Sequence, residues 1–346
     1  MRSILPLFVL ALATPALATD GVLEINQTCA VETGCFPGDA PGFPVTADGS
    51  AGKSYLLTSD LTLPDANTTG VEMGSDVALD LNNFAIVGPV VCLVGSGGLE
   101  CDPAGGSGSG VTASPTGSTA SVKNGTITGM GADGVALCSL RCEVSNIHVR
   151  SNGRDGIAVG VNSKVTGSTA IRNGRSGIRA GSGSTLAVNT VSGNGDDGIA
   201  IGEGSTITGN TSYQNYGDGI DLGPGSSVVG NTASENQGDG IAANVAATLS
   251  QNTAYGNWGD GISTLEGATV SDNTVYGNRG DGVQAGSGSN VSRNGVRQNF
   301  GYGLNLESTA SYRENTITTD AVLSTGTVLG GVDAGANVCN GSLTCP

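Results

Sequence analysis

Apolar and polar positions alternate along most of this chain in short runs that repeat every 21 residues. Each repeat begins at a Gly followed by an aliphatic residue, a variable residue and a small or aliphatic residue, as in Gly177-Ile178-Arg179-Ala180. This in–out–in order is typical of a short β-strand and too short for a helical pattern. Further apolar rows follow nine and fourteen residues after the Gly, as at Leu186 and Val191. The pattern therefore predicts three short strands per repeat.

Repeats of this length are stacked units that bury their apolar faces against their neighbours. The repeat glycines are Gly156, Gly177, Gly198, Gly219, Gly240, Gly261, Gly282 and Gly303. Three strands in 21 residues form one triangular coil, and successive coils pair in parallel about 4.8 Å apart. The crossover rule makes the coil right-handed. We expect an all-β fold, a right-handed single-stranded parallel β-helix of about 21 residues per rung, with Ile178, Ile199, Ile220 and Ile241 stacked inside.

Two rows of Asn keep the same period. They are Asn189, Asn210, Asn231, Asn252, Asn273, Asn294 and Asn315, and Asn173, Asn194, Asn215, Asn236, Asn257, Asn278 and Asn299. A turn leaves backbone groups inside the solenoid without partners, and leaving them unpaired is costly. An Asn amide both donates and accepts, so we expect these rows to bond to turn backbone and to each other.

Units such as Asn210-Thr211 followed by Asn215-Tyr216-Gly217-Asp218-Gly219-Ile220 resemble the parallel β-helix repeats of the pectin lyase-like superfamily, in the style of NosD-like domains. The resemblance covers roughly residues 71–318. It implies the fold and a group of proteins that includes polysaccharide lyases, glycoside hydrolases and uronate epimerases. The calcium–arginine and paired-Asp sites of that superfamily have no convincing counterpart here, and a copper role finds little support because His148 is the only His.

The two ends differ from the repeat. Residues 1–18 are typical of a secretory signal, with Arg2, an apolar run and a small-residue cleavage site. The apolar run is too short to span a membrane, and no later segment is long enough. We expect 19–70 to be an N-terminal cap, 71–318 the β-helix and 319–346 a C-terminal cap. The Gly/Ser-rich stretch 95–119 is expected to be a loop from an early rung.

The cysteines fit an exported protein. They form four pairs of near neighbours, Cys29/Cys35, Cys92/Cys101, Cys138/Cys142 and Cys339/Cys345. Exported cysteines are usually oxidised, and the short separations favour local disulfides, although sequence alone leaves 105 connectivities open. We expect a monomer that is secreted, extracellular or periplasmic.

Charge limits the possible partners. The net charge of −16 disfavours nucleic acid, which requires a basic surface. Basic residues nevertheless gather between 141 and 179, and His148, Arg150 and Arg172 fall on neighbouring rungs. A catalytic interpretation has Arg neutralise a uronate carboxylate while His148 or an Arg removes the adjacent proton. Anion binding and a basic patch without a ligand are the alternatives.

Aromatic residues occur in the later units of the repeat series, and they recur at the same positions of the unit. Tyr213, Tyr255 and Tyr276 share one outward row, Tyr216, Trp258 and Phe300 share a second, and Tyr302 follows. Clustered exposed aromatics often mark a binding surface, and their flat faces with polar rims suit sugar rings. We expect a carbohydrate-binding surface of flat faces. The alternatives are stacking that only stiffens the turns, or a protein or lipid partner.

An Asp row precedes the repeat Gly at Asp197, Asp218, Asp239, Asp260 and Asp281. Like charges at the rung spacing repel by about 1 kcal/mol even in water. Bonds to turn N–H groups, bridging Ca²⁺ or raised pKa values could offset this repulsion. Turn-capping is the principal expectation and Ca²⁺ the candidate cofactor.

Three function classes remain open. The first is a non-catalytic exported β-helix that binds extracellular or cell-surface polysaccharide. The second is a polysaccharide lyase or uronate epimerase acting on acidic glycans. The third is a structural envelope or adhesion protein.

Overall fold

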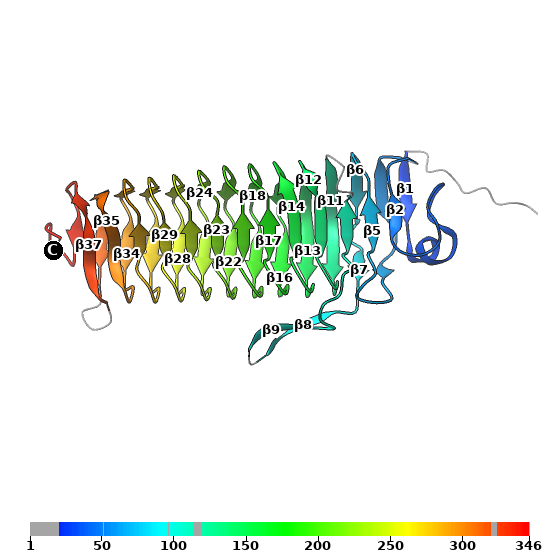
Figure 1. Cartoon of the computed structure of the whole chain (residues 1–346), viewed down its shortest axis with the longest axis horizontal. Helices are drawn as coiled ribbons and strands as arrows, with labels where there is room; N and C mark the ends of the chain where they lie inside the picture. Colours follow the sequence, from blue (N-terminus) through cyan, green and yellow to red (C-terminus); the bar gives the residue numbers. More distant parts are fainter. Residues whose placement is uncertain (1–20, 51, 96, 114–118, 320–323, 346) are drawn as a thin grey trace, which may run out of the picture.

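The computed structural model describes residues 21–50, 52–95, 97–113, 119–319 and 324–345. The predicted signal segment 1–18 lies outside this range. Short strands stack into one elongated parallel coil (Figure 1). The four isoleucines from Ile178 to Ile241 are paired in register from rung to rung and fully buried. The predicted parallel β-helix and its register are confirmed.

Each regular rung has three strands separated by tight turns. The first strands are β14 (Ile157–Val161), β17 (Ile178–Ala180), β20 (Ile199–Ile201), β23 (Ile220–Leu222), β26 (Ile241–Ala243), β29 (Ile262–Thr264) and β32 (Val283–Ala285). The second strands are β15 (Lys164–Thr166), β18 (Thr185–Ala187), β21 (Thr206–Thr208), β24 (Ser227–Val229), β27 (Thr248–Ser250), β30 (Thr269–Ser271) and β33 (Asn290–Ser292). The third strands are β16 (Thr169–Ile171), β19 (Thr190–Ser192), β22 (Thr211–Tyr213), β25 (Thr232–Ser234), β28 (Thr253–Tyr255), β31 (Thr274–Tyr276) and β34 (Gly295–Arg297).

The parallel pairing extends beyond the predicted limits of 71 and 318. The early strands are β1 (Val22–Ile25), β2 (Val45–Ala47), β3 (Ser54–Leu57), β4 (Leu61–Thr62), β5 (Val71–Met73), β6 (Val77–Asp80), β7 (Ala85–Val87), β10 (Val111–Ala113), β11 (Ala120–Thr128), β12 (Val135–Leu140) and β13 (Glu143–Arg150). The segment 19–70 was expected to be an N-terminal cap, and its strands β1–β4 all pair in parallel with neighbouring strands. Its loops vary in length, which hides the 21-residue period in the sequence.

The two ends carry the remaining elements. A π-helix, η1 (Cys29–Thr33), follows β1, and Figure 1 shows it at the N-terminal end of the coil. The C-terminal rungs contain β35 (Tyr302–Arg313), β36 (Thr316–Thr318), β37 (Gly326–Asp333) and β38 (Val338–Cys339). The last two pair in parallel with β35 and β36, so the segment after 318 continues the ladder.

Both Asn rows are buried and hydrogen-bonded as expected. Asn231 is representative: its Oδ1 accepts the backbone N–H of Asn210 at 2.8 Å and the Asn210 side-chain amide at 3.0 Å. Its Nδ2 donates to the carbonyl oxygen of Ile207 at 2.9 Å and to Oδ1 of Asn252 at 3.1 Å. Each amide therefore satisfies buried backbone on its own corner and links successive rungs.

Three of the predicted disulfides are present, Cys29–Cys35, Cys92–Cys101 and Cys339–Cys345. The fourth predicted pair involves Cys138, whose side chain lies outside the described part of the chain. The Cys92–Cys101 bond joins an antiparallel hairpin, β8 (Val91–Gly95) and β9 (Gly98–Asp102). The Gly/Ser-rich stretch 95–119 is thus only partly loop, because its first residues complete this hairpin and Val111–Ala113 returns to the ladder as β10.

Candidate functional site

The predicted aromatic residues lie where the third strand of each rung turns into the next rung. Tyr213, Tyr255 and Tyr276 end their strands, while Tyr216, Trp258 and Phe300 each follow a buried Asn of the turn. Trp258 is 50% exposed and Phe300 is 43% exposed, whereas the tyrosines of both rows and Tyr302 are half-buried. We call these seven residues the aromatic surface. Parallel register places each row along the coil axis.

The stacking of Tyr276 differs from the expected row of flat faces. The Tyr255 and Tyr276 rings are nearly parallel, 3° apart, with centroids separated by 5.0 Å. On the following rung, the guanidinium of Arg297 lies 4.5 Å from the Tyr276 ring centroid. Because Tyr276 has a neighbour on both sides, it presents its ring edge and hydroxyl to solvent. Its face is not available to a sugar.

Trp258 has one covered face. We call the positions that directly follow the buried Asn of each turn, such as Tyr216 and Trp258, the turn row. Arg279 occupies this row one rung after Trp258, and its guanidinium lies 4.1 Å from the Trp258 ring centroid. A cation over an indole ring at this distance is a favourable contact, and it holds the ring in one orientation. The other face of Trp258 is directed towards the preceding rung, which carries Gln237 at the equivalent position.

The rung between the two aromatic groups carries no aromatic side chain. Ser234 is the last residue of its strand, in the same row as Tyr213 and Tyr255, and the strand register pairs it with both. Gln237 occupies the turn row between Tyr216 and Trp258, and it is exposed. Ser234 is buried, at 4% exposure, so its neighbours cover it and Gln237 is the exposed residue of this rung. We call the position of Ser234 and Gln237, between the aromatic residues of the two flanking rungs, the slot. Tyr213 and Tyr255 are two rungs apart, about 9.6 Å at the spacing of parallel strands.

The Asp row lies beside the turn row and is hydrogen-bonded. Oδ1 of Asp197 accepts the backbone N–H of Asp218 at 2.7 Å, and the same bond recurs from Asp218 through Asp260, each to the next Asp of the row. Asp281 accepts the N–H of Tyr302 at 2.6 Å in the same way. These bonds are the turn-capping expected from the sequence. The described residues contain no group of three or more His, Cys, Asp or Glu arranged to hold a metal ion.

Burial makes these carboxyls less acidic. Partial burial raises the pKa of Asp197 to about 7; the hydrogen bond from the Asp218 N–H opposes this rise, and neighbouring carboxylates add to it to a smaller extent. Burial similarly raises the pKa of Asp260 to about 6, and it raises the pKa values of Asp218 and Asp239. Asp197 is therefore partly protonated near neutral pH, which reduces its repulsion with the neighbouring carboxylates.

The basic candidates lie on the same turn side, nearer the N-terminus. His148 and Arg150 are exposed on β13, with Val149 buried between them, as expected. Arg172 is exposed one rung later. The register pairs His148 with Thr169 and Arg150 with Ile171, so these three side chains belong to adjacent rungs. Two nearby arginines form ion pairs with aspartates of earlier rungs: Arg179 contacts Asp155 at 2.8 Å, and Arg154 contacts Asp133 at 3.8 Å.

Comparison with known proteins matches this architecture. The family model described as "Right handed beta helix region" matches residues 70–212, 109–248 and 180–322. The chain belongs to this family. No curated protein shows a sequence match to this β-helix chain.

Solved structures share the fold at low identity. The A-module of mannuronan C-5 epimerase AlgE6 from Azotobacter vinelandii is 15% identical, with 82% of this chain and 90% of that chain covered and a TM-score of 0.56. The Dettilon tailspike protein is 13% identical over 92% of this chain and 61% of its own, with a TM-score of 0.52. The Agl-KA catalytic domain is 12% identical over 82% of this chain and 62% of its own, also with a TM-score of 0.52. These likenesses establish the β-helix fold.

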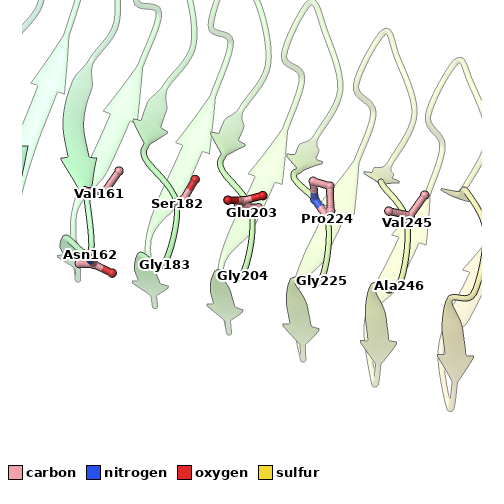
Figure 2. Close-up of a pocket in the computed structure, with 10 residues that line it drawn as sticks. All are labelled: Val161, Asn162, Ser182, Gly183, Glu203, Gly204, Pro224, Gly225, Val245 and Ala246. Atoms are coloured by element: carbon pink, nitrogen blue, oxygen red, sulfur yellow. The ribbon is translucent and has the colours of Figure 1, made fainter.

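The β-helix also has a groove that the sequence pattern did not indicate. It lies on the corner between the first and second strands, where Val161, Pro224 and Val245 border an open space of about 580 Å³ (Figure 2). Among the described residues that line it, Glu203 is the one carboxyl and none is aromatic. The groove therefore has fewer groups for recognition than the aromatic surface. In the part of the chain that the structure describes, no helix is long and apolar enough to cross a membrane.

The raised pKa values predict that the β-helix becomes more stable on acidification from pH 8 to pH 5. Because Asp197 and Asp260 have folded pKa values above the unfolded value of about 3.9, the folded state holds more protons between pH 4 and 7. Stability then falls as pH rises through that window. Melting temperatures measured at pH 5 and pH 8 test this.

Asp197→Asn is the matched variant, since its amide oxygen can accept the same Asp218 N–H without carrying charge. We expect it to melt higher than wild type at pH 8 and to show a smaller difference between the two pH values. A wild-type protein that melts higher at pH 8 than at pH 5 would contradict the assigned pKa shifts.

Proposed function

We propose that this protein is an exported β-helix that binds a polysaccharide along the aromatic surface without transforming it. The observation that carries the proposal is the slot. Tyr213 and Tyr216 stand on one side of it and Tyr255 and Trp258 on the other, with Gln237 exposed between them and Ser234 buried beneath its neighbours. A purely structural stack would gain most from an aromatic on every rung.

The width of the slot suits one sugar ring. Apolar atoms make contact at about 4.0–4.5 Å, so a ring held between two aromatic faces requires about 8–9 Å. The two-rung separation of about 9.6 Å provides that space, whereas the one-rung separation between Tyr255 and Tyr276 leaves room only for direct stacking. The exposed Gln237 amide can donate and accept hydrogen bonds to sugar hydroxyls.

Rigidity of the aromatic walls supports binding. Arg279 fixes Trp258, and Tyr276 supports Tyr255 from behind. Aromatic side chains already held in place lose little conformational entropy when a ligand binds. The slot lies beside the acidic row, so we propose a neutral polysaccharide there in preference to a polyuronate, whose carboxylates would be repelled.

The fold relatives support the substrate class. One of them is named a mannuronan C-5 epimerase, and mannuronan is an acidic polysaccharide, so this relative supports a polysaccharide ligand in general and not the choice of a neutral one. The three disulfides suit an oxidising extracellular or periplasmic location, where polysaccharides are encountered.

Filling the slot tests the proposal. Ser234→Tyr places a ring between Tyr213 and Tyr255, where it can stack as Tyr276 does on Tyr255. We expect this variant to keep or raise the melting temperature and to lose binding on a glycan array of neutral and uronate polymers. Ser192→Tyr is the control, because it lies in the same row on the far side of Tyr213 and leaves the slot open. Equal binding by both variants would exclude the slot.

A second candidate function is a lyase or epimerase on acidic glycans, centred on His148. The exposed grouping of His148, Arg150 and Arg172 on adjacent rungs favours it. Arg150 or Arg172 would neutralise the uronate carboxylate while His148 removes the adjacent proton. An absorbance assay for unsaturated uronates, with an isotope-exchange assay for epimerisation, distinguishes the two functions. Turnover by wild type that His148→Ala abolishes would establish the enzyme.

The third class, a structural envelope or adhesion protein, is the remaining outcome. It is favoured if wild type binds no polymer on the array and transforms none. In that case the aromatic surface serves to stiffen the turns, and the Tyr255–Tyr276 stack is its most direct sign.

A further inference from the structure

The hairpin β8–β9 lies against the turn side of the coil and ends at the aromatic surface. Its base is anchored near Asn152, whose carbonyl oxygen is 3.6 Å from Sγ of Cys92 and 3.9 Å from Sγ of Cys101. At its tip, a Cβ added to Gly98 would lie 3.5 Å from Cε1 of Tyr216. Figure 1 shows the hairpin running alongside the coil in the C-terminal direction. The hairpin thus covers the turn corner from Asn152 to Tyr216.

The turn sequence changes where the hairpin ends. Under the hairpin, the residue after each buried Asn is Gly, at Gly153, Gly174 and Gly195. An added Cβ at Gly174 would lie 2.4 Å from the carbonyl oxygen of Gly153 and 3.2 Å from Sγ of Cys101, so the coil backbone excludes a larger residue there and the disulfide packs beside the Gly. Beyond the tip the same row carries large side chains, Tyr216, Gln237, Trp258, Arg279 and Phe300. The glycine moves one residue later, to Gly217 and its equivalents.

The end of the hairpin and the change in turn sequence therefore fall at the same rung, and they divide the turn side of the coil into two parts. In the first part the small turns accommodate a covalently closed hairpin. In the second part the large side chains are left uncovered by it. A ligand that follows the turn row towards the N-terminus therefore meets the hairpin tip beside Tyr216.

We propose that the hairpin tip closes one end of the polysaccharide-binding surface, so that the protein binds a segment of bounded length that stops at Tyr216. The inference rests on the proposed function. The open part of the turn row runs from Tyr216 to Phe300, four rung intervals or about 19 Å. Additional sugar units beyond that length meet the hairpin on one side and gain no contact with the row there.

A length series tests the inference on wild-type protein. Oligomers are prepared by size fractionation from the array polymer that wild type binds most tightly, and their affinities are measured by calorimetry. We expect affinity to rise with length until the oligomer spans about 19 Å and then to level off. Affinity that continues to rise with length would overturn the inference.

A shortened hairpin provides the second arm. Joining Leu93 to Glu100 through an Asn-Gly turn removes the tip and retains the Cys92–Cys101 disulfide at the base. We expect this variant to bind the longest oligomers several-fold more tightly than wild type, with short oligomers unchanged. Identical length dependence in both proteins would show that the hairpin does not limit the bound segment, and it would leave the proposed function intact. Absence of binding to every polymer would overturn the proposed function itself.

Discussion

Trp258→Ala is expected to weaken oligosaccharide binding by about 2 kcal/mol or more, which is the loss typical of a central aromatic anchor. Trp258 forms one wall of the slot, and Arg279 holds it in place. Because half of the side chain is exposed, its removal should change the melting temperature little. Calorimetric titration and thermal melting of the same preparations provide the measurement.

Leu265→Ala is the control for that variant. Leu265 is 51% exposed and lines a small pocket on a different corner of the coil, between the first and second strands. The substitution removes exposed apolar surface away from the slot, so binding should remain at the wild-type level. If Trp258→Ala instead lowers stability strongly and leaves binding intact, the aromatic surface is a packing element.

Asn231→Ala is expected to lower the free energy of unfolding by more than about 3 kcal/mol. Truncation removes the acceptor of the Asn210 N–H, one acceptor of the Asn210 amide and the donor to the Ile207 carbonyl. Each buried group left unpaired costs about 1–3 kcal/mol. Urea unfolding followed by circular dichroism measures the change.

Asn290→Ala makes the same substitution at an exposed position of β33. Surface substitutions away from special features change stability by about 0.5 kcal/mol or less. Equal losses from both variants would mean that burial of the Asn rows contributes little to the coil.

Much of the fold could be predicted from the sequence because each rung repeats the same local solution. The spacing of Ile178, Ile199 and Ile220 determines the register, since a slip by one residue would expose the core row. The Asn rows were predictable for the same reason. Residues 19–70 were not, because strands such as Ser54–Leu57 lie between loops of unequal length and leave no period.

The candidate site was predictable in position and less so in geometry. The sequence indicates that Tyr255 and Tyr276 share a row, but not that their rings stack or that Arg279 and Arg297 cover neighbouring faces. Side-chain torsions decide those contacts, and residue spacing does not specify them. The hairpin contact with Tyr216 joins positions more than 100 residues apart, and no repeat pattern relates them.

The most direct test of the account is the fluorescence of Trp258 during titration with a bound oligosaccharide. Trp258 is the single Trp of the sequence, so its emission reports the slot wall without interference from other indoles. We expect a saturable change in emission with the same midpoint as calorimetric binding, and loss of that change in Ser234→Tyr. Tight oligosaccharide binding that leaves the emission of Trp258 unchanged would contradict it.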